Sequence, residues 1–194
     1  FLTGSKPKTV GSMCKRHYFG GEKADDLRCP DCPEKGSCPY DASALYGKSD
    51  DTICRNDLCV FAKEIDIFDN ESCMIELENG VIGTYSECFF AKSPFTRRYE
   101  YNGTDGFMSL DFSKGEIFLR NSKGEETFKF EYNGRIHYNG APGVTKHFLE
   151  LMNGANVRIH SPVDEAFDAE LISFAAYKSA AESRFVDVAE LRAR

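Results

Sequence analysis

Apolar residues recur at every second position through the middle of the chain. Between Glu71 and Tyr132 this alternation is interrupted by short polar turns. A period of two predicts β-strands, because successive side chains of a strand point to opposite faces of a sheet. A further short strand is expected over residues 8–14. The strands expected in the alternating segment are residues 71–78, 81–90, 97–101, 107–112, 116–120 and 127–132.

Turn residues separate these strands. Asn79-Gly80 lies between two alternating runs and predicts a hairpin with a type I′ turn, in which both central residues have positive φ. The next two turns also carry glycines, at residues 103–106 and 113–115. Connections as short as these join antiparallel neighbours, so the strands are expected to form a meander.

The pattern becomes helical after the last of these strands. Apolar residues over 144–152 predict an amphipathic helix that ends at Gly154. A second helix is predicted to have Ser161 as its N-cap and Pro162 as its first helical residue, and to run to about Arg184. Its apolar face is expected to hold Val163, Phe167, Leu171, Phe174 and Tyr177.

The order of the elements predicts the α+β class. Residues 185–188 are expected to return as an edge strand, and the 194 residues suit a single domain. Strands in one block followed by helices predict an open, mainly antiparallel β-sheet with helices packed on one face. Residues 16–57 interrupt this pattern with Gly, Pro, Asp and Cys. We expect them to form an irregular cysteine-rich insertion, in which Asp41 caps a short helix that runs to Tyr46.

Charge and composition exclude several classes of function. The formal net charge is −7, and the lysines and arginines are scattered, whereas binding to nucleic acid needs a basic stripe. The apolar stretches are too short to span a bilayer, and no charged-then-apolar leader precedes Phe1. We therefore expect a cytoplasmic protein with no nucleic-acid or membrane partner. The chain also lacks both glycine-rich loops that hold nucleotides, Gly-x-Gly-x-x-Gly and the Walker A loop.

The densest local signal is a run of cysteines. Cys29, Cys32 and Cys38 are spaced so that their thiolates could reach one zinc ion, with Cys14 or His17 as the fourth ligand. The insertion has few apolar residues, so a zinc site there would have to fold around its ion. Packed reduced thiols and a disulfide are the two other interpretations. Four further cysteines are expected to be buried as small hydrophobic residues: Cys54, Cys59, Cys73 and Cys88.

Candidate substrate-binding residues lie on either side of the strand block. Glu64, Asp66 and Asp69 form an acidic group, and at least one of them must face solvent because even and odd positions of a strand point to opposite sides. His137 follows the last strand and precedes a glycine-rich turn, where loops over a sheet edge often carry function. The alternative is that these carboxylates and this imidazole are ordinary solvated side chains.

Several motifs occur in an order that resembles a known family. Phe1–Val10 is similar to a Trp-Leu-x-Gly-Ser-x-Pro-x-x-Val motif that leads into a first sheet strand. Residues 28–32 and 38–42 resemble an Arg-Cys-x-Asp-Cys and Cys-Pro-Tyr-Ser-Ala insertion. Leu58–Phe61 resembles the Arg-Cys-Val-Tyr segment after it, as Asp66–Asp69 resembles the next one, and His137–Phe148 is similar to a His-Gly-Gly-Gly-Asp motif. Together these motifs resemble the C-terminal domain of the Gfo/Idh/MocA oxidoreductases, the relatives of glucose-fructose oxidoreductase and inositol dehydrogenase.

The resemblance implies a two-domain enzyme that moves hydride between NAD or NADP and a hydroxyl carbon of a sugar, polyol or related compound. Its Rossmann domain, with the cofactor-binding and catalytic residues, would lie before Phe1. This chain alone is therefore expected to be inactive. It would supply a homo-oligomer interface through the sheet face and part of a substrate pocket. The pocket residues that we expect from this chain are Asp66, Asp69, Arg98 and His137.

Three residues depart from the family pattern at polar positions that usually contact substrate. Asn70 replaces a His, Glu71 replaces a Gln, and Ala141 stands where the family has an Asp. These departures indicate an unusual substrate or none. A second interpretation is therefore a non-catalytic binding or assembly module on the same fold, with zinc as a stabilising ion. A Rossmann glycine loop upstream in the gene would favour the enzyme.

Overall fold

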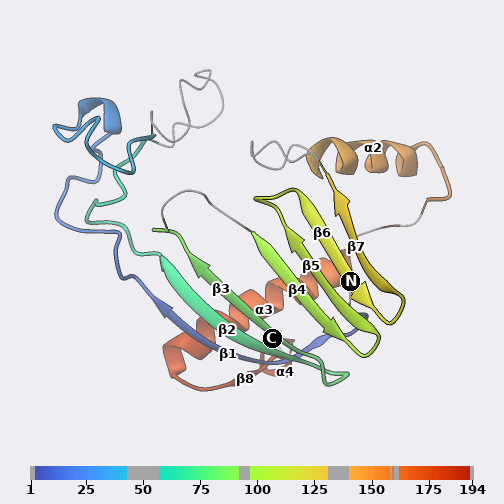
Figure 1. Cartoon of the computed structure of the whole chain (residues 1–194). Helices are drawn as coiled ribbons and strands as arrows, with labels where there is room; N and C mark the ends of the chain where they lie inside the picture. The colour runs from blue at the N-terminus through green and yellow to red at the C-terminus, as the bar shows by residue number, and fades with distance from the viewer. Residues whose placement is uncertain are drawn as a thin grey trace. The chain divides into compact units, whose positions relative to one another are not determined.

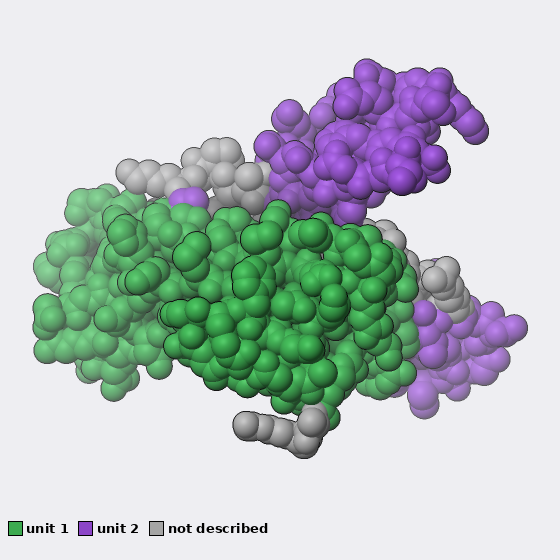
Figure 2. Space-filling view, turned by 90° about the horizontal axis from the view of Figure 1, so that it is seen from below, with its two compact units in different colours: residues 1–90, 161–194 green, residues 91–160 purple. Residues whose placement is uncertain are grey.

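The computed structural model describes residues 3–42, 57–91, 97–130, 140–157, 159 and 162–192. The chain divides into two compact units, which Figure 2 shows in separate colours. Unit 1 joins Phe1–Phe90 to Ser161–Arg194, and unit 2 is the intervening segment Ala91–His160.

Unit 1 is a four-stranded sheet with a long helix on one face (Figure 1). Its strands have the order β3-β2-β1-β8, and all neighbours are antiparallel. The short strand β8 lies at the edge beside β1, as expected. Helix α3 packs against β1, and a short helix α4 follows β8. The bounds are β1 Pro7–Lys15, β2 Asn70–Leu77, β3 Ile82–Cys88, α3 Val163–Glu182, β8 Val186–Asp187 and α4 Ala189–Arg192.

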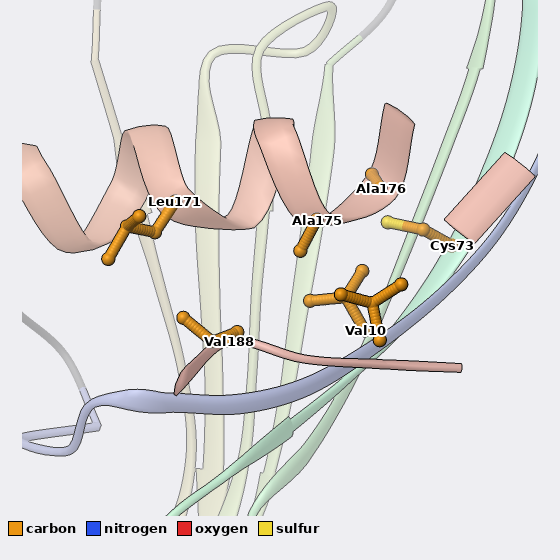
Figure 3. Packing of buried hydrophobic residues seen from close by; sticks show 7 residues of the cluster. Val10, Cys73, Leu171, Ala175, Ala176 and Val188 are labelled. Carbon is orange, nitrogen blue, oxygen red and sulfur yellow. The ribbon is translucent and has the colours of Figure 1, made fainter. Parts of the chain in front are cut away.

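The core of unit 1 lies between α3 and the sheet (Figure 3). Three valines are fully buried there, and each stabilises the fold by about 1.5–3 kcal/mol relative to an exposed side chain. The helix contributes mainly small residues, which allow its backbone to approach the strands closely. The buried cluster consists of Val10, Cys73, Leu171, Ala175, Ala176, Val186 and Val188.

A buried serine joins the helix to the first strand. Strand β8 pairs with Thr9 and Val10 and ends there. Beyond that point the backbone N–H of Ser12 donates to the Ser179 hydroxyl at 2.8 Å, and this hydroxyl donates to the Arg184 carbonyl at 2.6 Å. Ser179 therefore satisfies one backbone group of the strand and one at the end of the helix, both of which would be costly to bury unpaired.

In its described residues, unit 2 contains a four-stranded antiparallel meander and the helix α2. The strand order follows the sequence order, β4-β5-β6-β7, as the short turns predicted. The helix α2 lies where the 3.6-residue period placed it. The bounds are β4 Arg98–Gly103, β5 Gly106–Asp111, β6 Glu116–Asn121, β7 Gly124–Lys129 and α2 Gly140–Met152.

The α+β class, the antiparallel pairing and the open sheets are confirmed, but the strands divide between two sheets instead of one. The hairpin at Asn79-Gly80 is also confirmed. The predicted type I′ turn was wrong. That turn requires positive φ at both Asn79 and Gly80, but of the two only Gly80 has it (84°). Gly80 N–H bonds to the Leu77 carbonyl at 2.9 Å, so Glu78 and Asn79 form the turn and Gly80 takes the left-handed position after it.

The expected apolar face of α3 was wrong in most positions. Leu171 is buried, but Phe167 and Phe174 are 54% and 62% exposed. The side packed on the sheet carries Ala175, Ala176 and Ser179 instead. Side-chain size explains the difference. A helix packs closely on a strand through small side chains, whereas the prediction from periodicity relied on the large apolar ones. The N-cap position is Pro162, and Ser161 lies outside the described residues.

No helix in the described ranges combines the length and the apolar character needed to cross a membrane. The short helix expected from Asp41 to Tyr46 falls almost entirely outside these ranges, as does Cys54.

Candidate functional site

One buried carboxylate fixes the point where the insertion leaves the sheet. Asp69 is 1% exposed and accepts three backbone N–H bonds, from His17 at 2.8 Å, Tyr18 at 2.8 Å and Phe19 at 2.7 Å. Burial raises the pKa of Asp69, but the three N–H donors outweigh burial and hold its pKa below the ordinary value. Both carboxylate oxygens are thus used to hold residues 17–19 in place.

An aromatic cluster holds the described parts of the insertion together. The rings of Tyr18 and Phe90 are 5.3 Å apart, those of Phe19 and Tyr40 are 5.0 Å apart, and Phe61 contacts three of these rings. The Tyr40 hydroxyl donates to the Phe90 carbonyl at 2.8 Å, and burial raises the pKa of Tyr40. The described part of the insertion is therefore held by a small apolar cluster that it shares with Phe61 and Phe90, which corrects the premise that only an ion could hold it.

A pocket beside this cluster is lined by four cysteines. Cys29 is the first residue of a one-turn helix, η1 (Cys29–Asp31), Cys32 follows directly after it, and Cys38 comes after a further turn. Cys59 comes from the returning chain, where Arg28 and Leu58 form an antiparallel bridge. The pocket is lined by Lys23, Cys29, Cys32, Lys35, Cys38, Tyr40, Asp41, Cys59, Val60 and Phe61.

A lysine places a positive charge beside these thiols. Lys23 Nζ lies 2.7 Å from a Glu34 carboxylate oxygen and 4.0 Å from the Cys32 sulfur. The bond to Glu34 raises the pKa of Lys23, and the nearby sulfurs of Cys32 and Cys59 raise it further. The ammonium group therefore stays charged at the edge of the pocket.

The two residues expected to complete a zinc site lie elsewhere. Cys14 is in β1, with its sulfur 3.2 Å from the Ser12 hydroxyl, and the His17 ring lies 5.9 Å from the Phe90 ring at a tilt. Neither lines the pocket. The seven cysteines within the described ranges are free thiols, and no three His, Cys, Asp or Glu side chains there are grouped to hold a metal ion as they stand. Of the cysteines expected to be buried, Cys73 is buried, whereas Cys88 is exposed.

The predicted substrate residues are spread over the two units. Asp66 is exposed in unit 1, and Asp69 is committed to its three backbone donors. In unit 2, Arg98 on β4 donates to Asp111 on β5 at 3.1 Å, and the two residues are directly opposite each other in register. The Ser113 hydroxyl, the Arg98 guanidinium and nearby backbone N–H groups lower the pKa of Asp111 to about 2. His137 lies outside the described residues.

An acidic pair on the sheet of unit 1 is a further candidate. Glu71 on β2 stands directly opposite Glu87 on β3, and Tyr85 donates its hydroxyl to Glu87. Burial raises the pKa of Glu71, and the charge of Glu87 raises it further. Burial also raises the pKa of Tyr85, as does the bond to Glu87. Like charges opposite each other destabilise a sheet, and perturbed pKa values concentrate at functional sites.

Sequence reasoning identified neither this pair nor Cys59 as part of a site. The signal for the pair was the departure at Glu71, where the resembled family has a Gln. The register that places Glu87 opposite it follows from the β2–β3 hairpin. The signal for Cys59 was its match to the cysteine of the family's Arg-Cys-Val-Tyr segment, but its place near the other cysteines depends on a bridge between Arg28 and Leu58, which are far apart in sequence.

Comparison with known proteins gave matches in structure. No family model matches the sequence, and no curated protein matches it. An oxidoreductase from Thermotoga maritima is 17% identical with a TM-score of 0.58, over 96% of this chain and 42% of its own. An oxidoreductase from Agrobacterium radiobacter, in complex with NAD+, L-tartaric acid and magnesium, is 15% identical with a TM-score of 0.59. The match covers 96% of this chain and 44% of that protein. Levoglucosan dehydrogenase, in complex with NADH and levoglucosan, is 16% identical with a TM-score of 0.59, and the match covers 94% of this chain and 45% of that protein.

This chain spans less than half of the length of each of these three proteins. At such low identity the match establishes the fold. The resemblance found in the sequence is thus confirmed at that level: the chain has the fold of the C-terminal domain of Gfo/Idh/MocA-type oxidoreductases.

Proposed function

We propose that this chain is the substrate domain of an NAD(P)-dependent oxidoreductase that acts on a hydroxyl carbon of a sugar, polyol or related compound. The observation that carries the proposal is the structural match over 96% of the chain to an oxidoreductase solved with NAD+ and a hydroxy acid. The cofactor would be held by a Rossmann domain of the complete protein, and the complete enzyme would work in the cytoplasm. This chain would contribute the wall of the pocket that faces the substrate.

The acidic pair is the best-supported part of that wall. Glu71 and Glu87 face each other with their charges in conflict, and Tyr85 adds a hydroxyl at the same end of the sheet. Groups of this kind bind sugar or polyol hydroxyls, because a carboxylate accepts and a protonated carboxyl or phenol donates. Asp66, Arg98 and His137 remain proposed contacts, and Asp69 would act by positioning residues 17–19.

Kinetics of the complete gene product tests both parts of this proposal. Oxidation of NADH and NADPH would be followed with keto sugars, and reduction of the oxidised cofactors with polyols. We expect turnover with at least one pair. We also expect Glu71→Gln to lower kcat/KM by roughly tenfold, as the loss of one charged hydrogen bond does. Asp26→Asn, an exposed carboxylate of the insertion, is the control.

The two parts of the proposal fail in different ways. A folded complete protein that binds neither cofactor would overturn the oxidoreductase assignment. An active enzyme in which Glu71→Gln leaves kcat/KM unchanged would overturn only the role of the acidic pair. Removing one of two opposed charges should in itself stabilise the sheet. A loss of activity together with an unchanged or higher melting temperature would therefore separate a functional role from a structural one.

We further propose that the chain self-associates through the sheet face of unit 1 that lies opposite α3. Alternation along the strands directs Met13, Met74 and Ile82 to that face, and all three are exposed. Phe185 lies there too, since its ring covers Gly11. Exposed apolar side chains gathered on one sheet face are typical of an interface.

A further inference from the structure

We propose that Cys29, Cys32, Cys38 and Cys59 form a four-thiolate site for one zinc ion. The four residues line the same pocket although Cys59 lies beyond the insertion, on the returning chain. The fourth ligand is Cys59, in place of Cys14 or His17, which lie outside the pocket. The proposal is independent of the oxidoreductase assignment, because it concerns how the insertion is held together.

The backbone already holds the four positions close to one another. Cys32 N–H bonds to the Cys29 carbonyl at 3.3 Å, which closes the tight turn that a C-x2-C pair needs. Cys38 N–H bonds to the Glu34 carbonyl at 3.0 Å. On the returning chain, Cys29 N–H bonds to the Asp57 carbonyl at 2.8 Å, and Cys59 N–H bonds to the Leu27 carbonyl at 2.9 Å. The last two bonds pair the segment of Cys29 with the segment of Cys59, so that Cys59 lies opposite Leu27, two residues before Cys29.

Proline follows each of the first three ligands in the chain. Pro30, Pro33 and Pro39 come directly after Cys29, Cys32 and Cys38. Proline has a fixed φ, and it restricts the backbone of the residue before it. Each of these three cysteines therefore loses little further backbone freedom when it binds an ion.

Binding requires the thiol side chains to turn toward a common point. As they stand, no three donor side chains in the described ranges are grouped around a point that an ion could occupy. A cysteine sulfur moves by rotation about χ1, between staggered positions that differ little in energy. All four cysteines are half-buried and line the pocket, so each thiol has open space beside it in which to rotate.

The chemistry of the donors selects zinc among common divalent ions. Zinc takes four thiolates in a tetrahedron, whereas magnesium and calcium prefer oxygen ligands. Binding releases four protons, one from each thiol, and leaves a site with a net charge of −2 from four thiolates and one Zn²⁺. Lys23 lies against the Cys32 sulfur and would offset part of that charge, as donors around thiolate sites do.

Metal analysis of the whole chain tests the proposal. Protein purified without chelator would be measured by elemental analysis and then titrated with Co²⁺ after removal of its metal. We expect about one zinc per chain in the wild type and a Co²⁺ spectrum with thiolate charge-transfer bands of a tetrahedral site. Cys59→Ser should lose the zinc, while Cys14→Ser should keep it, because Cys14 lies in β1 outside the pocket.

Two outcomes would overturn the site. One is a wild-type chain that binds well below one equivalent of zinc or Co²⁺ even when the metal is supplied. The other is a Cys14→Ser variant that loses as much metal as Cys59→Ser. If Cys59→Ser fails to fold, the Co²⁺ titration of the wild type still decides, because four thiolates and three give different charge-transfer intensities.

Discussion

At the scale of a single residue, Asp69 joins the chain that returns from the insertion to the chain that enters it. Its own N–H bonds to the Lys15 carbonyl at 3.0 Å, and its carboxylate accepts from residues 17–19. A carboxylate with three N–H donors is strongly preferred to an amide, which would turn a donor of its own toward them.

We expect Asp69→Asn to lower the free energy of unfolding by about 1–3 kcal/mol, the cost of leaving buried polar groups poorly paired. Denaturant titration would measure it, and hydrogen exchange should show that the amides of residues 17–19 lose protection. Asp66→Asn, at an exposed carboxylate three residues earlier, is the control. Equal exchange rates at residues 17–19 in Asp69→Asn and the wild type would contradict the role.

The acid dependence of this variant gives a second check. The pKa of Asp69 is lowered in the folded protein, so its contribution is fully present above the unfolded-state pKa of about 4 and is lost as the pH falls through the folded pKa. The stability difference between wild type and Asp69→Asn should therefore be constant near neutral pH and shrink below about pH 4.

At the scale of elements, the edge of the unit 1 sheet depends on one close approach. A Cβ added at Gly11 in β1 would lie 2.4 Å from the ring of Phe185, which precedes β8. The ring can lie this close to the strand because the strand has no side chain at that position. This contact places β8 beside β1 and so supports Val186 and Val188 in the core.

We expect Gly11→Ala to displace the Phe185 ring and to destabilise unit 1 by about 1–3 kcal/mol, the usual cost of overpacking. Gly83 in β3 is the matched control, because an added Cβ there meets no atom within 4 Å. Thermal unfolding of the two alanine variants would compare them. Equal melting temperatures would show that the Phe185 ring moves aside without cost.

The strands and hairpins could be predicted because their signals are local. Alternation placed β2 and β3, and Asn79-Gly80 marked the turn between them even though its type differed. The side of α3 that packs on the sheet could not be predicted from the pattern of apolar residues. Ala175, Ala176 and Ser179 are small, and only their distance to the strands shows that they form the contact side.

The same difference between local signals and contacts made only by the fold applies to the candidate site. The C-x2-C-x5-C spacing was visible in the sequence, since a tight turn brings such residues together without help from elsewhere. Cys59 joins them through a bridge between Arg28 and Leu58, a contact that depends on how the insertion folds back. Glu71 and Glu87 likewise face each other only in the observed register of β2 and β3. The turn type sets that register, and a change of turn type would shift the pairing by one residue.

At the scale of the whole molecule, this chain should not hold the cofactor by itself. The sequence carries no glycine-rich loop that presents a helix N-terminus to a pyrophosphate. We expect the chain of residues 1–194 to show no micromolar binding of NADH or NADPH by fluorescence titration, whereas the complete gene product should bind one of them. Micromolar binding by this chain alone would contradict the prediction.

Self-association also belongs to this scale. We expect light scattering to show an oligomer at tens of micromolar and Met74→Glu, at the centre of the exposed face of β2, to return the chain to monomers. Ile67→Glu introduces the same charge at an exposed apolar residue outside the sheet and should leave the oligomer intact. A wild type that stays monomeric throughout this range would count decisively against the proposed interface.

The order of the two units along the chain has a consequence for biosynthesis. Unit 1 is built from both ends of the sequence, and Ser12 bonds to Ser179 across a separation of 167 residues. At a synthesis rate of about 5–20 residues per second, β1 would wait roughly ten seconds or more for α3 to be made. The meander of unit 2 needs only neighbouring hairpins, so it can fold while still attached to the ribosome. The nascent chain should therefore expose the bare inner face of β1–β3 to chaperones until α3 arrives to cover it.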